Sequence, residues 1–332
     1  MKKLVCICLF AVAFSLLSAT TSCMAKDETN LSAWLVYWDM HKGTDELIKS
    51  GDTYDEISLF AAYFNEKGKL FVPENLQVDK TKIKNWQQFS TRYLTVVNDV
   101  QMKDKTSFKD IKIVKKVLAN PKLQAKHADE IIALAKKYDC NGIDLDYERV
   151  FRDSQASKLY VDFIQILADK AKANKLKLRV ILEPNVDFKA YKFPEYPRYM
   201  VMMYNLYGTH SEKAGAKADF VFIKNTLNKM QALPENRGVA FATGGCYWND
   251  KGERKFISSD EAVKLARKYK QIPKRSFDSN ALNFSYEENN VKYTVWYADK
   301  MTLYSWISRA QAVGINDIAI WRLGSNDAVY KF

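Results

Sequence analysis

The stretch "NGIDLDYE", residues 141–148, places three carboxylates on one side of a short segment. Asp144, Asp146 and Glu148 alternate with apolar residues, and side chains two residues apart point to the same face of a β-strand. Each step of two residues advances about 6.6 Å along a strand. The three residues therefore form an acid ladder, with Asp144 at its start and Glu148 at its C-terminal end.

Crowded carboxylates can carry proton chemistry. Each raises the pKa of its neighbours, which keeps one of them protonated near neutral pH and able to act as a general acid. A calcium loop is a second interpretation, but it needs Gly at its sixth position, where Arg149 stands, and ligands on a turn. A structural acid cluster is a third interpretation, although buried charges are an expensive source of stability.

Eight apolar, strand-like segments follow one another along the chain, with helical periodicity between many of them. Several are apolar at every position, which is typical of parallel strands covered on both faces. They predict a single α/β domain, a (β/α)8 TIM barrel, with the acid ladder facing the lumen and Glu148 at the C-terminal mouth. A doubly wound open sheet is the alternative, which the lack of a Gly-rich phosphate loop weakens. The segments are residues 33–39, 54–64, 91–99, 142–148, 176–184, 199–205, 237–244 and 317–323.

The connecting segments carry helix and hairpin signals. Ser258 and Glu261 have the spacing of a capping box at the start of a helical pattern. Residues 273–299 read as a β-hairpin with residues 287–290 in its turn. We therefore expect a small β-hairpin insertion between strands 7 and 8 of the barrel.

The acid ladder resembles a known family signature. "NGIDLDYE" is similar to the D-G-x-D-x-D-x-E motif of glycoside hydrolase family 18, the chitinases and endo-β-N-acetylglucosaminidases, with Asn141 at its first Asp. "MMYN" (202–205) resembles the family's M-x-Y-D on strand 6, and Trp321 resembles its strand 8 tryptophan. The first two strands resemble the branch that includes spore-cortex-lytic N-acetylglucosaminidases. The resemblance covers nearly the whole mature chain.

The resemblance implies a mechanism. Glu148 would protonate the glycosidic oxygen, and the 2-acetamido oxygen of the substrate would attack the anomeric carbon, so that configuration is retained. Asp146 would orient the acetamido group, and Asp144 would hold Asp146 and share its proton. The implied substrate-binding residues are Tyr204, on the acetamido carbonyl, Trp321, under the sugar, and Met202 and Asn205 of the strand 6 motif.

Two features could modify this site. Asn205 stands where most members have Asp, and an uncharged amide there could shift the pKa of Glu148. Aromatic residues near the mouth could extend the cleft or pack in the core instead. Glu183, at the end of strand 5, could reach the cleft or cap the following helix. The aromatic candidates are Tyr37, Trp38, Tyr207, Tyr247 and Trp248.

The resemblance implies a retaining glycosidase that cleaves glycans containing β-linked N-acetylglucosamine: chitin-like oligomers, peptidoglycan or the N-glycan core. The alternative is a non-catalytic glycan-binding surface lipoprotein on the same barrel. Chitinase-like lectins typically lose the last acid of the signature. Glu148 is present, which favours an enzyme.

The composition of the 332 residues, 47% hydrophobic and 27% charged, is ordinary for a globular protein. The formal charge is +12, but the lysines are scattered over helical patterns, which argues against a nucleic-acid partner. The histidines, His41, His127 and His210, are far apart and lack ligand spacing, which argues against a zinc site. We expect a monomer without metal or other cofactor.

The N-terminus reads as an export signal. Lys2 and Lys3 precede the apolar residues 4–17, small residues follow, and Cys23 comes next. This pattern predicts a lipoprotein signal over 1–22, a tether over 23–31 and a catalytic barrel over 32–332. The expected location is the bacterial cell envelope, at the outer-membrane surface or in the periplasm, with a lipid anchor on Cys23. Cleavage near Ala25 without lipid is the alternative.

Two cysteines remain in the folded part of the chain. Cys140 precedes strand 4, at the bottom of the predicted barrel, and Cys246 follows strand 7, at its top. A disulfide needs Cα atoms within about 7 Å. We therefore expect both thiols to stay unpaired.

Overall fold

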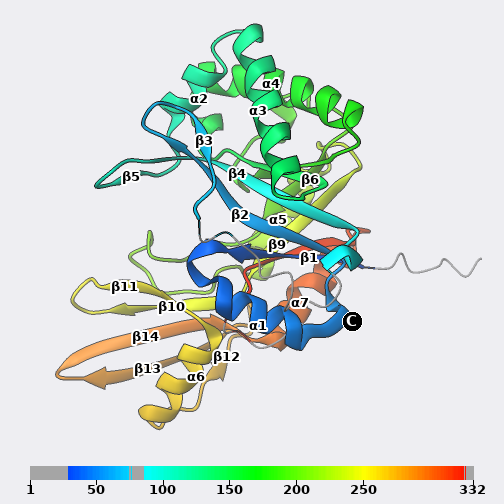
Figure 1. Ribbon diagram of the computed structural model, residues 1–332. Helices are drawn as coiled ribbons and strands as arrows, with labels where there is room; N and C mark the ends of the chain where they lie inside the picture. The colour runs from blue at the N-terminus through cyan, green and yellow to red at the C-terminus, as the bar shows by residue number, and fades with distance from the viewer. Residues whose placement is uncertain (1–28, 75, 77–85, 325, 327–332) are drawn as a thin grey trace, which may run out of the picture.

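The computed structural model describes residues 29–74, 76, 86–324 and 326. Eight parallel strands form a closed barrel, because the last strand pairs with the first, with Asn30 opposite Asp317. The predicted barrel is confirmed, and the open sheet is excluded (Figure 1). The barrel strands are β1 (Asn30–Val36), β2 (Glu56–Asn65), β4 (Thr91–Gln101), β6 (Gly142–Asp146), β7 (Lys177–Leu182), β8 (Arg198–Met202), β9 (Arg237–Ala242) and β15 (Asp317–Trp321).

Helices cover the outside of the barrel. α2, α3 and α4 gather on one side of it (Figure 1). Between β7 and β8 the connection holds only the short 3-10 helix η5 (Phe188–Ala190). Two very short strands, β3 (Leu70–Phe71) and β5 (Thr106–Ser107), extend the barrel sheet beside β2 and β4. The helices between barrel strands are α1 (Met40–Ser50), α2 (Ile111–Val117), α3 (Pro121–Lys137), α4 (Ser154–Ala173), α5 (Phe220–Met230) and α7 (Lys300–Gln311).

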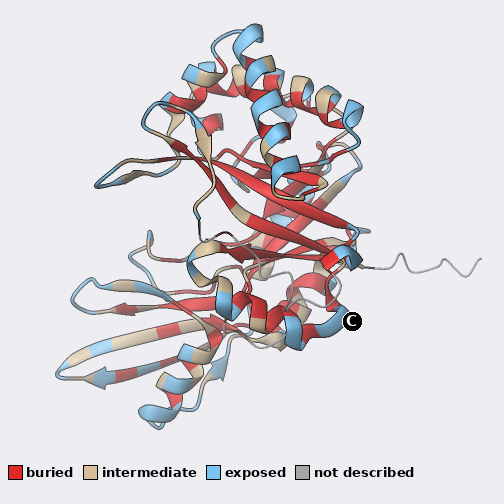
Figure 2. Cartoon of the chain, viewed as in Figure 1, coloured by how far each residue is buried: buried red, intermediate tan, exposed pale blue. Residues whose placement is uncertain are grey.

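The alternation in β6 divides its side chains between two environments. Ile143 and Leu145 are fully buried in the main core between strands and helices. Asp144 and Asp146 face the lumen, as predicted, and the barrel strands are buried along their length (Figure 2). The apolar residues of the lumen form a separate cluster: Trp34, Ile181, Met200, Met202, Tyr204, Ala240, Ala242 and Ala319.

Gly142 begins the lumen-facing row of β6 for a steric reason. A Cβ atom at this position would lie 2.6 Å from the ring of Tyr93 and 2.7 Å from the methyl group of Thr91. Any larger residue would displace both side chains of β4. The glycine of "NGIDLDYE" therefore leaves room for Tyr93 beside the acid ladder.

The segment between β9 and β15 contains more than the predicted hairpin. The hairpin exists, with Asn289 and Asn290 in its turn at positive φ. It belongs to a five-stranded antiparallel sheet in the order β11-β10-β14-β13-β12, next to α6, which opens with the predicted Ser258–Glu261 capping box. The elements are β10 (Gly244–Asn249), β11 (Arg254–Ile257), α6 (Ser259–Lys268), β12 (Lys274–Arg275), β13 (Leu282–Glu288) and β14 (Val291–Ala298).

The insertion starts directly at the mouth of the barrel. Gly244 has φ +64°, a conformation that favours glycine, and its Cβ atom would lie 2.5 Å from the carbonyl oxygen of Ile257. β9 can therefore turn into β10 within two residues, so the second sheet stands beside the barrel mouth (Figure 1). The sequence did not separate β10 from β9, because the two strands are almost continuous.

None of the helices in the described part of the chain is long and apolar enough to cross a membrane. The predicted signal over 1–22, Cys23 and most of the tether lie outside the described residues. Cys140 and Cys246 are both buried, and neither of them forms a disulfide.

Candidate active site

Asp144, the deepest rung of the acid ladder, is fully buried and ion-paired. The Nε atom of Arg179 donates to its Oδ1 at 2.7 Å, and the Nη2 atom donates to its Oδ2 at 2.8 Å. The hydroxyl of Thr95 adds a bond to Oδ2 at 3.2 Å. Both carboxylate oxygens are therefore occupied by neighbours other than Asp146.

Arg179 explains how a charge can be held in the lumen. Its remaining donors reach the hydroxyls of Ser32 and Ser58, each at 2.8 Å. Its guanidinium also lies over the rings of Trp34 and Tyr93, at 5.1 and 4.1 Å from their centroids. This residue was not singled out from the sequence. An arginine inside an apolar strand was nevertheless a usable signal, because a buried charge needs a partner.

Asp146, the middle rung, carries an unused oxygen. It is 8% exposed, and its buried Oδ1 has no hydrogen-bond partner among the described residues. Burial raises the pKa of Asp146 well above its usual range, and the charges of Glu148, Asp144 and Asp99 add to this effect, while Lys109 opposes it. Burial therefore favours the protonated form of Asp146, and its free oxygen is available to a ligand.

Arg179 also affects the relation between Asp144 and Asp146. The expectation that the two residues share a proton stays a prediction. Arg179 engages both oxygens of Asp144, so Asp144 acts on Asp146 through its negative charge, which raises the pKa of Asp146.

Glu148, the last rung, is fixed through its main chain. Its N–H donates to Oδ1 of Asn98 at 2.9 Å, and Nδ2 of Asn98 donates back to its carbonyl at 3.0 Å. Its side chain forms an ion pair with Lys109. Burial raises the pKa of Glu148, and the ammonium of Lys109 works in the opposite direction. Sequence reasoning missed Asn98 and Lys109, because both lie far from residues 141–148 in the chain.

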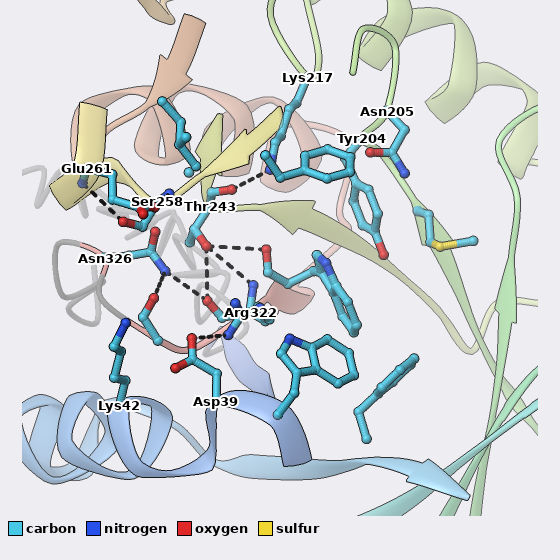
Figure 3. Close-up of a pocket in the computed structure, with 18 of the residues that line it drawn as sticks. Asp39, Lys42, Tyr204, Asn205, Lys217, Thr243, Ser258, Glu261, Arg322 and Asn326 are labelled. Atoms are coloured by element: carbon cyan, nitrogen blue, oxygen red, sulfur yellow. Dashed lines mark hydrogen bonds and ion pairs between the residues drawn. The ribbon is translucent and has the colours of Figure 1, made fainter. Parts of the chain in front are cut away.

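Asp146 and Glu148 open into a cleft of about 570 Å³ between the barrel mouth and the insertion. This volume lies within the usual range for small-ligand sites. Barrel loops supply most of the wall, and β10, β11 and α6 supply the rest (Figure 3). The lining residues are Trp38, Asp39, Lys42, Phe60, Lys109, Asp146, Glu148, Met202, Tyr204, Asn205, Lys217, Thr243, Gly244, Phe256, Ile257, Ser258, Glu261, Trp321, Arg322, Gly324 and Asn326.

Four predicted binding residues line this cleft together with the two acids: Met202, Tyr204, Asn205 and Trp321. Burial raises the pKa of the Tyr204 phenol well above its usual range, and the nearby Asp146 and Glu148 add to this effect. The phenol is therefore protonated and can donate a hydrogen bond. Trp321 packs edge-to-face on Trp34 and Phe60, with ring centroids 5.8 and 4.8 Å apart.

The structure does not bring Trp248 and Tyr37 to the cleft. Trp248 is 5% exposed, and its indole N–H donates to the carbonyl of Ser211 at 3.0 Å. Tyr37 packs edge-to-face between Trp38 and Tyr63, with centroids 5.0 and 5.8 Å away. Trp38 lies in front of it, 50% exposed, and lines the cleft. Tyr37 therefore supports Trp38 from behind, whereas Trp248 is buried in the second sheet.

Other candidates also lie elsewhere. Glu183 accepts a hydrogen bond from the main-chain N–H of Arg149 at 2.7 Å and is not a lining residue. It therefore neither enters the cleft nor caps the helix after strand 5. Tyr207 and Tyr247 are likewise absent from the lining.

Several polar residues of the cleft wall are hydrogen-bonded to one another (Figure 3). Nζ of Lys217 donates to the carbonyl of Thr243 at 2.7 Å, and burial lowers the pKa of Lys217 to about 8. Arg322 donates to Asp39 at 2.9 Å. These residues come from separate loops, so no local sequence pattern identified them. In the described part of the chain, no three His, Cys, Asp or Glu side chains are grouped to hold a metal.

Sequence comparison identifies the family. The profile of Glycosyl hydrolases family 18 matches residues 33–327, nearly the whole described chain. The chain belongs to this family. The resemblance carried by "NGIDLDYE" is thus confirmed, and the protein is a glycosidase that hydrolyses a glycan.

Named relatives lie among bacterial glycosidases. The chain is 26% identical over 262 residues to the uncharacterized glycosylase YvbX of Bacillus subtilis (strain 168), covering 74% of this chain and 72% of that protein. It is 25% identical over 223 residues to the cortical fragment-lytic enzyme of Bacillus anthracis, covering 63% of this chain and 52% of that protein. This chain therefore spans about half the length of the second relative.

Solved structures share the fold. The spore cortex-lytic enzyme SleL of Bacillus megaterium QM B1551 superposes with a TM-score of 0.75 at 17% identity, covering 90% of this chain and 71% of that one. A chitinase of Chromobacterium violaceum ATCC 12472 gives a TM-score of 0.77 at 16% identity, covering 91% of this chain and 96% of that one.

Proposed function

We propose that the protein is a retaining glycosidase that cleaves β-linked N-acetylglucosamine by substrate-assisted catalysis. The observation that carries this proposal is the pair Asp146 and Glu148 in the cleft, where a carboxyl group with a raised pKa and one unpartnered oxygen lies beside a second acid. The other cleft carboxylates are engaged: Asp39 accepts from Arg322, and Glu261 accepts from the main-chain N–H of Ser258.

The reaction begins at Glu148. Its carboxylic acid gives a proton to the glycosidic oxygen, the C1–O bond breaks, and the electron pair stays with the leaving sugar. The acetamido carbonyl oxygen of the substrate forms a bond to C1 and closes an oxazolinium ring. Asp146 binds the acetamido N–H, and Tyr204 donates to the acetamido oxygen.

The second half restores the enzyme. Glu148, now a carboxylate, takes a proton from a water molecule that attacks C1 and opens the ring. Two displacements at C1 retain the configuration. Trp321 provides an apolar surface for the sugar, and Asn205 contributes an uncharged amide where most members carry Asp.

We propose a substrate of the peptidoglycan class, with chitin-like oligomers and the N-glycan core as alternatives. Relatives named for the spore cortex and for chitin support glycans that contain N-acetylglucosamine. Asn205 and the charged residues of the cleft wall distinguish this site from a purely aromatic groove and suit a substrate with charged substituents.

The experiment is a hydrolysis screen of peptidoglycan, chitooligosaccharides and N-glycans with wild type and Glu148→Gln. The variant loses its proton donor, so we expect a rate loss of at least about 100-fold on the preferred substrate, with an unchanged circular dichroism spectrum and retained sugar binding. Glu212→Gln, which alters an exposed carboxylate, is the control and should keep full activity. Turnover by Glu148→Gln close to wild type would exclude Glu148 as the acid.

A further inference from the structure

Lys109 occupies a fixed position beside the proton donor. It follows β5 with φ +53°, and its main-chain N–H donates to Oδ1 of Asp99 at 2.7 Å, which ties its backbone to β4. Its ammonium forms an ion pair with Glu148. The side chain of Lys109 is 32% exposed and lines the cleft, so a ligand can reach it.

This ion pair opposes the task of Glu148. The titratable groups that face Glu148 are Asp146 at the end of β6, Asp99 on β4, Tyr204 after β8, Glu183 after β7, and Lys109. The acidic neighbours favour a protonated Glu148, while the ammonium favours the ionised form, which cannot give a proton. A group that draws the ammonium away would leave Glu148 protonated.

This inference rests on the proposed function. We propose that Lys109 is a specificity-determining residue: its ammonium leaves its ion pair with Glu148 and pairs with a carboxylate on the leaving sugar. The carboxylate would belong to an ether substituent on the carbon adjacent to the one that bears the glycosidic oxygen, as in the 3-O-lactyl group of N-acetylmuramic acid. Lys109 then binds substrate and releases the acid in one step.

The geometry of the reaction supports this exchange. Glu148 must reach the glycosidic oxygen to protonate it, so Lys109, in contact with Glu148, lies on the leaving-group side of the bond. A carboxylate attached through the ether oxygen next to the glycosidic oxygen of the leaving sugar lies in the same region as Lys109. The ammonium keeps one anionic partner throughout, so its charge is never left uncompensated. A neutral leaving sugar offers no such partner.

The test compares two substrates that differ in one charge: the disaccharide of N-acetylglucosamine β-1,4-linked to N-acetylmuramic acid, and its methyl ester. Wild type should show a kcat/KM about tenfold or more higher on the free acid. Lys109→Met should lose this preference through a lower rate on the acid, and Lys109→Arg should keep it. Lys105→Met, at an exposed position before β5, is the matched control and should behave as wild type.

A pH profile separates this role from a merely structural one. On the methyl ester, the upper pKa of kcat/KM should move to higher pH in Lys109→Met, because the ammonium that favours ionised Glu148 is gone. Equal wild-type rates on acid and ester, or an unchanged preference in Lys109→Met, would overturn the assignment.

An aryl glycoside of diacetylchitobiose, whose leaving group is neutral, reports on the proposed function alone. One outcome is that the aryl glycoside is hydrolysed in a Glu148-dependent way while wild type does not distinguish the free acid from the methyl ester. This result would exclude only the role of Lys109. A lack of hydrolysis of all three substrates would remove the proposed function and the role of Lys109 together.

Discussion

One strand presents three carboxylates, and the structure gives each a different environment. Asp144 is paired with Arg179, Asp146 has an unpartnered oxygen, and Glu148 meets Lys109. Three carboxylates in the sequence thus become a fully buried, ion-paired carboxylate, a carboxyl group whose pKa is raised by burial, and an ion-paired acid that lines the cleft. The differences come from the residues that other strands and loops place opposite each acid.

The buried Asp144–Arg179 pair should contribute more to the free energy of unfolding than an exposed ion pair does. Arg179→Met removes the cation but leaves a fully buried carboxylate, so we expect the free energy of unfolding to fall by about 3–5 kcal/mol in urea titrations at pH 7. Arg152→Met is the control, because Arg152 is 57% exposed in its ion pair with Glu183. Loss of this pair should lower the free energy of unfolding by less than about 1 kcal/mol. Similar losses in the two variants would contradict this ranking.

The identity of the nucleophile can be tested at Asp146. If the acetamido oxygen attacks C1, a thiazoline analogue of N-acetylglucosamine should inhibit, because it mimics the cyclised intermediate. Fully deacetylated chitosan oligomers should not be hydrolysed, since an amine has no attacking oxygen. Either hydrolysis of those oligomers or a covalent sugar ester on Asp146, detected by mass spectrometry, would indicate a conventional double displacement.

The sequence predicted the acid ladder because its spacing lies within one strand. Arg179, Asn98 and Lys109 could not be placed in the same way. Their positions depend on the register between strands, such as Val97 opposite Asp146, and on the course of the β5–α2 connection. Pairings of this kind are set by packing across the barrel and leave no local pattern.

At the scale of elements, the eight barrel strands were predictable because each is a distinct apolar segment. The insertion was only partly predictable. Its hairpin has a clear turn, but β11 spans only Arg254–Ile257 with two exposed residues, and β10 begins at Gly244, directly after β9. A strand of this length, or one that continues the preceding strand almost without a break, shows little hydrophobic periodicity of its own. The second wall of the cleft was therefore not expected.

This wall should contribute to substrate affinity. Phe256 on β11 is 50% exposed and lines the cleft, and Lys217 lies 5.5 Å from its ring centroid. We expect Phe256→Ala to raise KM for long oligosaccharides about tenfold, from lost apolar contact, with little change in kcat. Phe277→Ala, at a 98% exposed position of the same insertion, is the control. A fall in kcat alone would place Phe256 in a different role.

Helix α1 carries a pH-dependent contact with the chain after β15. Oε2 of Glu46 accepts from the N–H groups of Gly324 and Asn326, at 2.7 and 3.2 Å. Burial raises the pKa of Glu46 from 4.5 to about 7. The folded protein keeps this proton where the unfolded chain has released it, so the free energy of unfolding falls as pH rises between these values.

Glu46→Gln should remove this dependence. Relative to wild type, the variant should gain up to about 3 kcal/mol between pH 4.5 and pH 8, because one pKa unit corresponds to about 1.4 kcal/mol. Urea unfolding at both pH values measures the difference. Glu235→Gln, at an exposed carboxylate, should follow wild type at both. Parallel pH profiles for wild type and Glu46→Gln would show that Glu46 does not titrate in this range.

At the scale of the whole molecule, the cleft carries charges of both signs within a basic protein of formal charge +12. The carboxylates of the cleft are Asp39, Asp146, Glu148 and Glu261, and its basic side chains are Lys42, Lys109, Lys217 and Arg322. Charges of the two signs are interspersed, because Lys109 pairs with Glu148 and Arg322 pairs with Asp39. A polymer with negative substituents can therefore meet basic side chains at several points along the cleft. This distribution agrees with a peptidoglycan-class substrate better than with an uncharged polymer.

Such a substrate would place the enzyme in the cell envelope, and Cys23 provides the expected anchor. We propose that the chain is cleaved before Cys23 and lipidated there. Expressed in a bacterial host with labelled palmitate, wild type should take up label and sediment with membranes, whereas Cys23→Ala should be unlabelled and soluble. Cys8→Ala lies within the predicted signal and should behave as wild type. A wild-type mature chain that starts after Ala25, with no added lipid mass, would mean that the protein is an ordinary secreted glycosidase. Such a protein would be held at an envelope glycan only by binding in its cleft, without a lipid anchor.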